Sequence, residues 1–62
     1  MRFAPFLRSR RKALGLTQVQ CAHLLGYKRS KQIEFEAGTR APYKAEEVGI
    51  RAMLSEMRPK KY

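Results

Sequence analysis

The chain has 62 residues and a net charge of +9, with a pI of about 10.5. This length allows one small domain. One cysteine excludes an internal disulfide, and no cysteine–histidine cluster offers a structural zinc site. No apolar run of about 18 residues could span a membrane, and the N-terminus does not read as a signal peptide. We therefore expect a domain of a reducing intracellular compartment that uses no metal and no cofactor.

The positive charge is concentrated in the first half of the chain. Residues 1–33 contain eight lysines or arginines and no acid, whereas residues 34–62 contain six basic and five acidic residues. Solubility alone does not require such segregation. The distribution favours a polyanionic partner, either nucleic acid or an anionic membrane surface.

The first helix is expected over about residues 5–14. Pro5 opens this range. Its missing N–H costs nothing there, because an N–H in the first turn of a helix has no helical partner. Phe3, Leu7 and Leu14 recur on one face and predict a buried stripe. Gly15 suits the left-handed position that follows the last turn of a helix.

The second helix is expected to begin after Thr17 and to run to Leu25, where a glycine ends it. Thr17 is a favourable N-cap, and Gln20 three residues later completes a capping box. Cys21 and Ala22 share the inward face with Leu25. The spacing therefore predicts a short helix with a small-residue contact surface.

The third helix is expected over about Arg29–Ala37, closed by a glycine. Ile33 is predicted to point inward, together with Phe35 or Tyr27. Basic and polar residues crowd the N-terminal end of this helix: Lys28, Arg29, Ser30 and Lys31. Cations oppose the helix dipole there, but with the free N–H groups they make a favourable anion site.

The fourth helix is expected over about Lys44–Met57, with Glu46 and Glu47 in its first turn. Apolar residues on this helix repeat with helical spacing: Ile50, Met53, Leu54 and Met57. The four predicted helices indicate an all-α fold, a compact bundle of four to five helices. We expect a single domain over residues 1–62, with a core of about 3–57 and a basic tail at 58–62.

An ordered set of residues resembles a known family. The matching positions are Arg11, Gly15, Leu16, Thr17, Gln18, Ala22, Leu25, Gly26, Phe35, Glu36, Gly38, Arg40 and Pro42. Their order and spacing resemble the lambda-repressor/Cro type of helix-turn-helix domain, over roughly residues 3–57. The resemblance implies a DNA-binding domain in which Arg11 and Glu36 form a semi-buried ion pair.

The resemblance also implies roles on DNA. In this motif the third helix enters the major groove N-terminus first, and the second crosses the phosphate backbone. The implied base-reading residues are Arg29, Ser30 and Glu34, followed by Lys28, Lys31 and Gln32. The implied phosphate contacts are Thr17, Gln18, Arg40, Lys44 and Arg10.

Two positions depart from the family pattern. Cys21 stands where a leucine is usual, and we interpret it as a small buried hydrophobe. Gln32 stands where an aliphatic residue is expected, and the aliphatic Ile33 comes one position later. The sequence therefore leaves open whether the third helix is shifted or rotated by one residue.

The predicted function is a DNA-binding transcriptional regulator, a repressor that occupies an operator as a homodimer. The predicted dimer surface consists of Met53, Leu54 and Met57, with Tyr62 if it is ordered. The same apolar stripe is equally typical of a core that packs on the first helix. The small one-domain form resembles regulators of phages and mobile elements, which implies a cytoplasmic protein of a bacterial host.

The sequence leaves two other functions open. An antitoxin-type regulator that also binds a protein partner is one alternative, and a small basic RNA-binding protein is another. No catalytic residue is expected. Cys21 and His23 diverge on their helix, and the adjacent Glu46 and Glu47 also diverge, so neither pair can cooperate in catalysis.

Overall fold

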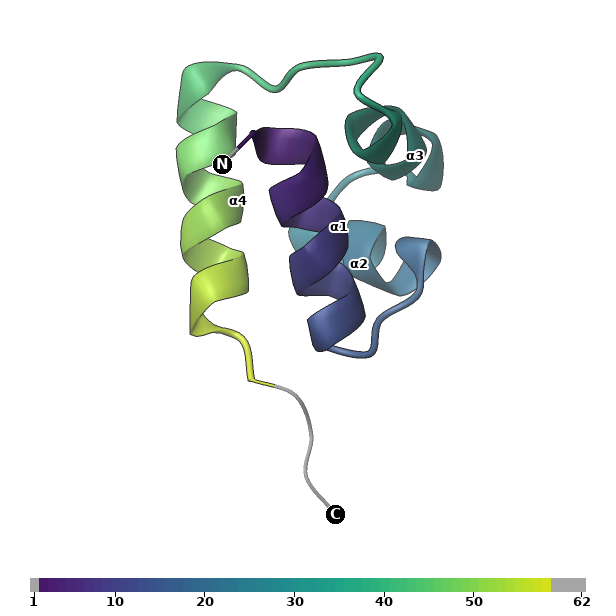
Figure 1. Cartoon of the computed structure of the whole chain (residues 1–62), viewed down its shortest axis with the longest axis vertical. Coiled ribbons are helices and arrows are strands. Elements are labelled where there is room, and N and C mark those ends of the chain that lie inside the picture. Colours follow the sequence, from purple (N-terminus) through teal and green to yellow (C-terminus); the bar gives the residue numbers. More distant parts are fainter. Residues whose placement is uncertain (1, 59–62) are drawn as a thin grey trace.

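The protein folds as four α-helices, with no strand among the residues described. The computed structural model describes residues 2–58 (Figure 1). The helices are α1 (Phe3–Ala13), α2 (Gln18–Leu25), α3 (Arg29–Ala37) and α4 (Lys44–Glu56). The expected all-α class is confirmed. Tyr62 and the predicted tail beyond Arg58 lie outside the described residues.

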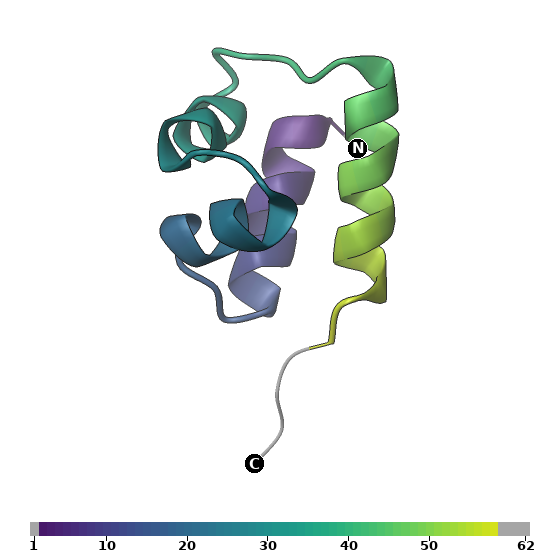
Figure 2. The same cartoon turned by 180° about the vertical axis from the view of Figure 1, so that it is seen from behind.

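The first helix lies at the centre of the arrangement. α4 packs on one side of α1, while α2 and α3 lie on its other side and contact each other (Figures 1 and 2). The segment between α3 and α4 passes over the N-terminal end of α1 (Figure 1). As a result α2 and α3 form one face of the molecule, and α4 forms the opposite face.

Local signals set the ends of the helices. The capping box of α2 is present: the Gln20 N–H donates to Thr17 Oγ1 at 3.1 Å, and the Thr17 N–H donates to Gln20 Oε1 at 2.9 Å. Gly26 has a φ of 85° and turns the chain from α2 towards α3, a conformation that costs glycine little. Helix α1 begins at Phe3, two residues earlier than predicted. Pro5 is tolerated there because the N–H groups of a first turn have no helical partner.

The hydrophobic core joins all four helices. Its fully buried members with the largest apolar side chains are Leu7 of α1, Phe35 of α3 and Leu54 of α4, and Cys21 contributes from α2. The Phe3 and Phe35 rings meet edge to face, with centroids 5.4 Å apart. Phe35 therefore lies where the helices converge.

The register of α3 differs from the prediction at one pair of residues. Gln32 is completely buried, whereas Ile33 is only partly buried and lies outside the core cluster. The helix has the expected bounds and is not shifted. Residues three apart share a helix face, so a buried Phe35 brings position 32 inward and turns position 33 away.

The apolar residues of α4 divide between the core and the surface. Leu54 is fully buried and Met57 packs against the core, whereas Met53 remains 42% exposed. The prediction that Leu54 contributes to a dimer surface is therefore wrong. Burial against α1 uses the side of α4 that carries Ile50 and Leu54, because these positions are four residues apart.

Candidate nucleic-acid interface

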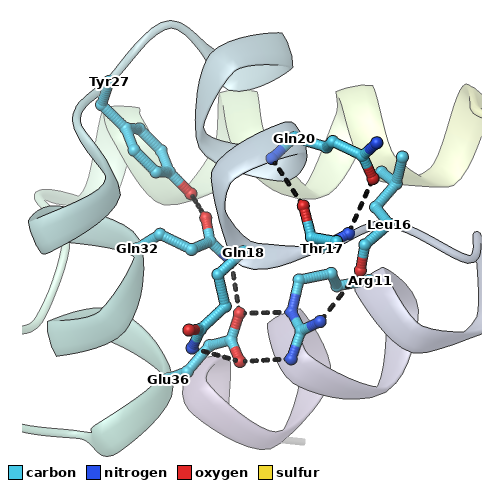
Figure 3. Close-up of polar contacts among 8 residues, drawn as sticks. All are labelled: Arg11, Leu16, Thr17, Gln18, Gln20, Tyr27, Gln32 and Glu36. Carbon is cyan, nitrogen blue, oxygen red and sulfur yellow. Dashed lines mark hydrogen bonds and ion pairs between the residues drawn. The ribbon is translucent and has the colours of Figure 1, made fainter.

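A polar network fixes the position of α3 against α1 and α2. The Arg11 Nε donates to Glu36 Oε2 at 2.7 Å and its Nη2 donates to Glu36 Oε1 at 3.0 Å (Figure 3). Arg11 Nη1 also donates to the Leu16 carbonyl at 2.9 Å, and Gln18 Nε2 donates to Glu36 Oε1 at 3.4 Å. The predicted ion pair is present, and it also ties down the loop between α1 and α2.

The buried Gln32 extends this network to the start of α3. The Tyr27 hydroxyl donates to Gln32 Oε1, and Gln32 Nε2 donates to Glu36 Oε2 (Figure 3). Both polar ends of Gln32 are therefore satisfied, which lowers the cost of burying an amide. Gln32 was predicted to read bases, and that prediction is wrong because its side chain is completely buried.

The network shifts the titration of its members. Burial raises the pKa of the Tyr27 hydroxyl, so it remains a neutral donor. Burial alone would raise the pKa of Glu36, but hydrogen bonds from Arg11, Gln32 and Gln18 together hold that pKa below its ordinary value. Glu36 is therefore an ionised carboxylate at neutral pH, matched by the guanidinium of Arg11.

The N-terminal end of α3 is open to solvent. Lys28, Arg29 and Ser30 are all exposed there, and no side chain caps the helix. Uncapped N–H groups and the positive end of the helix dipole attract anions. Two cations in the same place strengthen that attraction, so this end suits an anionic group such as a phosphate.

Two ion pairs border this exposed end. Lys31 Nζ donates to Glu46 Oε2 of α4 and lies 5.5 Å from the centre of the Phe35 ring. This bond lowers the pKa of Glu46. Arg40 Nε lies 2.8 Å from Glu34 Oε1, and both of these side chains are about half exposed. Lys31 is thus partly engaged in holding α4 near α3.

Residues from α3 and its two flanking loops surround a shallow hollow of about 350 Å³. Its lining is Tyr27, Lys28, Ser30, Lys31, Glu34 and Arg40. The structure therefore gathers four of the six predicted base-reading residues around one depression. Arg29 is exposed beside them on the first turn of α3.

The predicted phosphate contacts have different surroundings. Thr17 is exposed at the start of α2, Gln18 is half-buried against Glu36, and Lys44 is exposed at the start of α4. Arg10 is already used within the fold. Its Nε donates to the carbonyl oxygen of Leu54, and its Nη2 to that of Met57, each at 2.9 Å.

Arg10 therefore caps the C-terminal end of α4, and its prediction as a phosphate contact is not supported by its position. Free carbonyl groups at a helix C-terminus carry partial negative charge and favour a cation. The sequence offered no signal for this contact, since Arg10 and its acceptors are 44 and 47 residues apart.

Two further properties concern residues 2–58 as a whole. Within that range no cluster of three or more histidine, cysteine, aspartate or glutamate side chains is arranged to hold a metal ion. No helix in it has the length and apolar character needed to cross a membrane. Cys21 is fully buried, and burial raises the pKa of its thiol.

No family model, curated protein or solved structure matches the chain.

Proposed function

We propose that the chain is a sequence-specific double-stranded DNA-binding regulator of the lambda-repressor/Cro helix-turn-helix type, which represses by occupying an operator as a dimer. In this proposal α2, the turn at Gly26 and α3 are the helix-turn-helix. α3 enters the major groove with its N-terminal end, and α2 crosses the phosphate backbone.

The observation that carries the proposal is the contrast between the two faces of α3. One face holds Gln32, Phe35 and Glu36 in a packed, hydrogen-bonded interior. The other presents Arg29 and Ser30 to solvent at an uncapped helix end. A reading helix needs both properties, because a base contact is specific only when its helix is held rigidly.

Individual side chains on this surface suit particular bases. Arg29 has the geometry to bind guanine O6 and N7 with two hydrogen bonds, a contact typical of guanine recognition. Glu34 accepts hydrogen bonds and suits the amino group of cytosine. Lys28 and Lys31 are alternative readers, and Ser30 can bond to any base edge.

Backbone contacts position the domain without reading sequence. Thr17 and Gln18 at the start of α2, and Arg40 after α3, lie at the ends of the two helices and suit phosphates. Arg10 is left out of this set because α4 already engages both of its donor groups.

Binding to a duplex at increasing salt tests the proposal. If cations contact phosphates, the logarithm of the affinity falls linearly with the logarithm of salt concentration, because counterions are released from the DNA. A single-stranded RNA of equal length serves as the comparison ligand. Binding to RNA that equals or exceeds binding to DNA contradicts the proposal and favours the RNA-binding alternative.

A further inference from the structure

Ile33 is an aliphatic residue of α3 that the hydrophobic core does not use. Its side chain is partly exposed, and it belongs neither to the buried cluster nor to the residues that pack against that cluster. Gln32 and Phe35 are both completely buried on the inward side of the helix. Successive helical residues are turned by about 100° from each other, so a buried Gln32 directs Ile33 away from Phe35. The helix thus holds an amide inside and an aliphatic side chain outside, against the usual distribution.

The neighbours of Ile33 on the outward face of α3 are all exposed. Arg29 stands four residues and Ser30 three residues before it, and Ala37 follows four residues later. Positions three and four apart adjoin on one face of a helix. Ile33 therefore shares the face of two proposed base-reading residues. With Ala37 it makes the C-terminal part of that face apolar, whereas the N-terminal part is polar and basic.

Two features hold the Ile33 side chain in one place. The hydrogen bonds of Gln32 with Tyr27 and Glu36 fix the rotation of α3 about its axis, and with it the direction of the next residue (Figure 3). A β-branched side chain in a helix has one strongly preferred χ1 rotamer. The apolar surface of Ile33 is therefore preorganised, as a specific contact requires.

The major groove offers one apolar group that such a side chain can contact. The base edges present hydrogen-bond donors and acceptors there, and thymine adds its C5 methyl group. An aliphatic side chain placed against a donor or acceptor would displace water without replacing its hydrogen bond, which is unfavourable. Against the thymine methyl group, both apolar surfaces leave water, which is favourable. The chemistry of Ile33 therefore selects thymine among the four bases.

We propose that Ile33 is a base-reading residue that contacts the C5 methyl group of a thymine in the major groove. The inference rests on the proposed function and deepens it, because it adds a reader to the surface of α3 and names the base. Ile33 lies about 6 Å along the helix from Arg29, and base pairs are stacked about 3.4 Å apart. The thymine is therefore expected within about two base pairs of the pair that Arg29 contacts.

Removal of single methyl groups from the DNA tests the contact with the wild-type protein. The probe is a duplex carrying the site enriched from random sequences, in which each thymine is replaced in turn by deoxyuridine. Deoxyuridine lacks only the methyl group and keeps the same base pairing. At one thymine of a half-site the replacement is expected to weaken binding by about fourfold, the value of one buried methyl group. A site without thymine, or one in which no replacement weakens binding, overturns the proposal.

A substitution of Ile33 assigns the methyl contact to this side chain. Ile33→Ala is expected to bind the thymine and deoxyuridine duplexes with equal affinity, because the shortened side chain no longer reaches the methyl group. Leu24→Ala, at a half-exposed aliphatic residue of α2, is the matched control and is expected to keep the fourfold difference. Circular dichroism checks that each variant is folded. A merely structural role of Ile33 would weaken both duplexes alike, and an unchanged fourfold difference in Ile33→Ala overturns the assignment.

The two proposals fail in different ways. A protein that enriches a defined motif, but tolerates deoxyuridine at every thymine of that motif, refutes the role of Ile33 and leaves sequence-specific DNA binding intact. A protein that enriches no motif refutes the proposed function itself. The deoxyuridine series uses the wild-type chain, so its outcome does not depend on the folding of any variant.

Discussion

Arg11 and Glu36 join α1 to the end of α3 through two nearly parallel hydrogen bonds, at 2.7 and 3.0 Å. Their side chains are only 13% and 5% exposed. Gln18 and Gln32 add two further donors to the same carboxylate. The position of α3, and with it the orientation of the proposed reading surface, therefore depends on one shielded carboxylate.

Removing the charge of Glu36 is expected to destabilise the fold severely. Glu36→Gln leaves a shielded guanidinium without its counter-charge, at a cost of about 3–5 kcal/mol. This approaches the whole stability expected of a domain of this size. Urea denaturation followed by circular dichroism measures the loss. Glu34→Gln is the control, because its exposed pair with Arg40 contributes less than about 1 kcal/mol. Equal effects of the two substitutions contradict the role of Glu36.

Protonation of Glu36 is expected to lower the free energy of unfolding in acid. Burial opposes its ionisation, but hydrogen bonds led by Arg11 hold the folded-state pKa of Glu36 below its ordinary value. The unfolded chain therefore binds the proton more tightly. The contribution to stability is complete above the unfolded pKa of about 4.3 and is lost as pH falls through the folded pKa.

Urea midpoints measured across the acid range test this dependence. We expect a plateau from neutral pH down to about pH 5 and a decline below about pH 4. The hydrogen bond from Lys31 also lowers the pKa of Glu46. Glu46→Gln is therefore expected to remove part of the decline in the urea midpoint. A midpoint that does not change with pH in acid is the contrary result.

Substitutions of Gln32 and Tyr27 are expected to have coupled effects on the free energy of unfolding. Gln32→Leu leaves the Tyr27 hydroxyl without its acceptor and is expected to cost about 1–3 kcal/mol. Tyr27→Phe removes the stranded hydroxyl, so the double variant is expected to be more stable than the sum of the single losses predicts. A double-mutant cycle of unfolding free energies measures the coupling energy between the two residues. Strict additivity would show that the hydrogen bond contributes nothing.

Arg10 is expected to matter for stability more than for DNA binding. Arg10→Met keeps most of the apolar stem but removes both bonds to the carbonyl groups at the end of α4, at a cost of about 1–3 kcal/mol. Arg8→Met is the matched control, since Arg8 is an exposed cation of the same helix. Thermal denaturation distinguishes them. Unequal melting temperatures are predicted, with Arg10→Met the lower.

Base reading and phosphate contact predict different binding defects. Arg29→Ala is expected to relax preference at one base pair, worth about 1–3 kcal/mol of discrimination. Arg40→Ala is expected to weaken all duplexes by a similar factor and to reduce the salt slope by about one. Competition binding with a set of single-base operator variants measures both effects. A changed base preference in Arg40→Ala would contradict its assignment to phosphate.

Local signals in the sequence predicted much of this fold. The cap at Thr17 and the glycines that follow α2 and α3 gave the bounds of those helices, because these signals act within one turn. The period of apolar residues identified Leu7 and Leu54 as apolar-face positions. It did not separate the buried Leu54 from the exposed Met53 on α4, since both occur at helical spacing.

The errors have a common physical cause. The resemblance implied that Gln32 reads bases, but its burial depends on Tyr27 and Glu36, which the fold brings to it. The resemblance implied that Arg10 contacts phosphate. Its acceptors on α4 are 44 and 47 residues away in the chain, so no local pattern indicated them. Contacts of this kind are set by tertiary packing and cannot be predicted from the spacing of apolar residues along the sequence.

Selection of bound sites from a pool of random duplexes tests the central claim most directly. If α3 reads bases in the major groove, the wild-type protein enriches a defined motif. With a two-fold dimer, that motif has two inverted halves whose centres are about one helical turn, ~34 Å, apart. A bound pool with the same base composition at every position as the starting pool would contradict sequence-specific recognition.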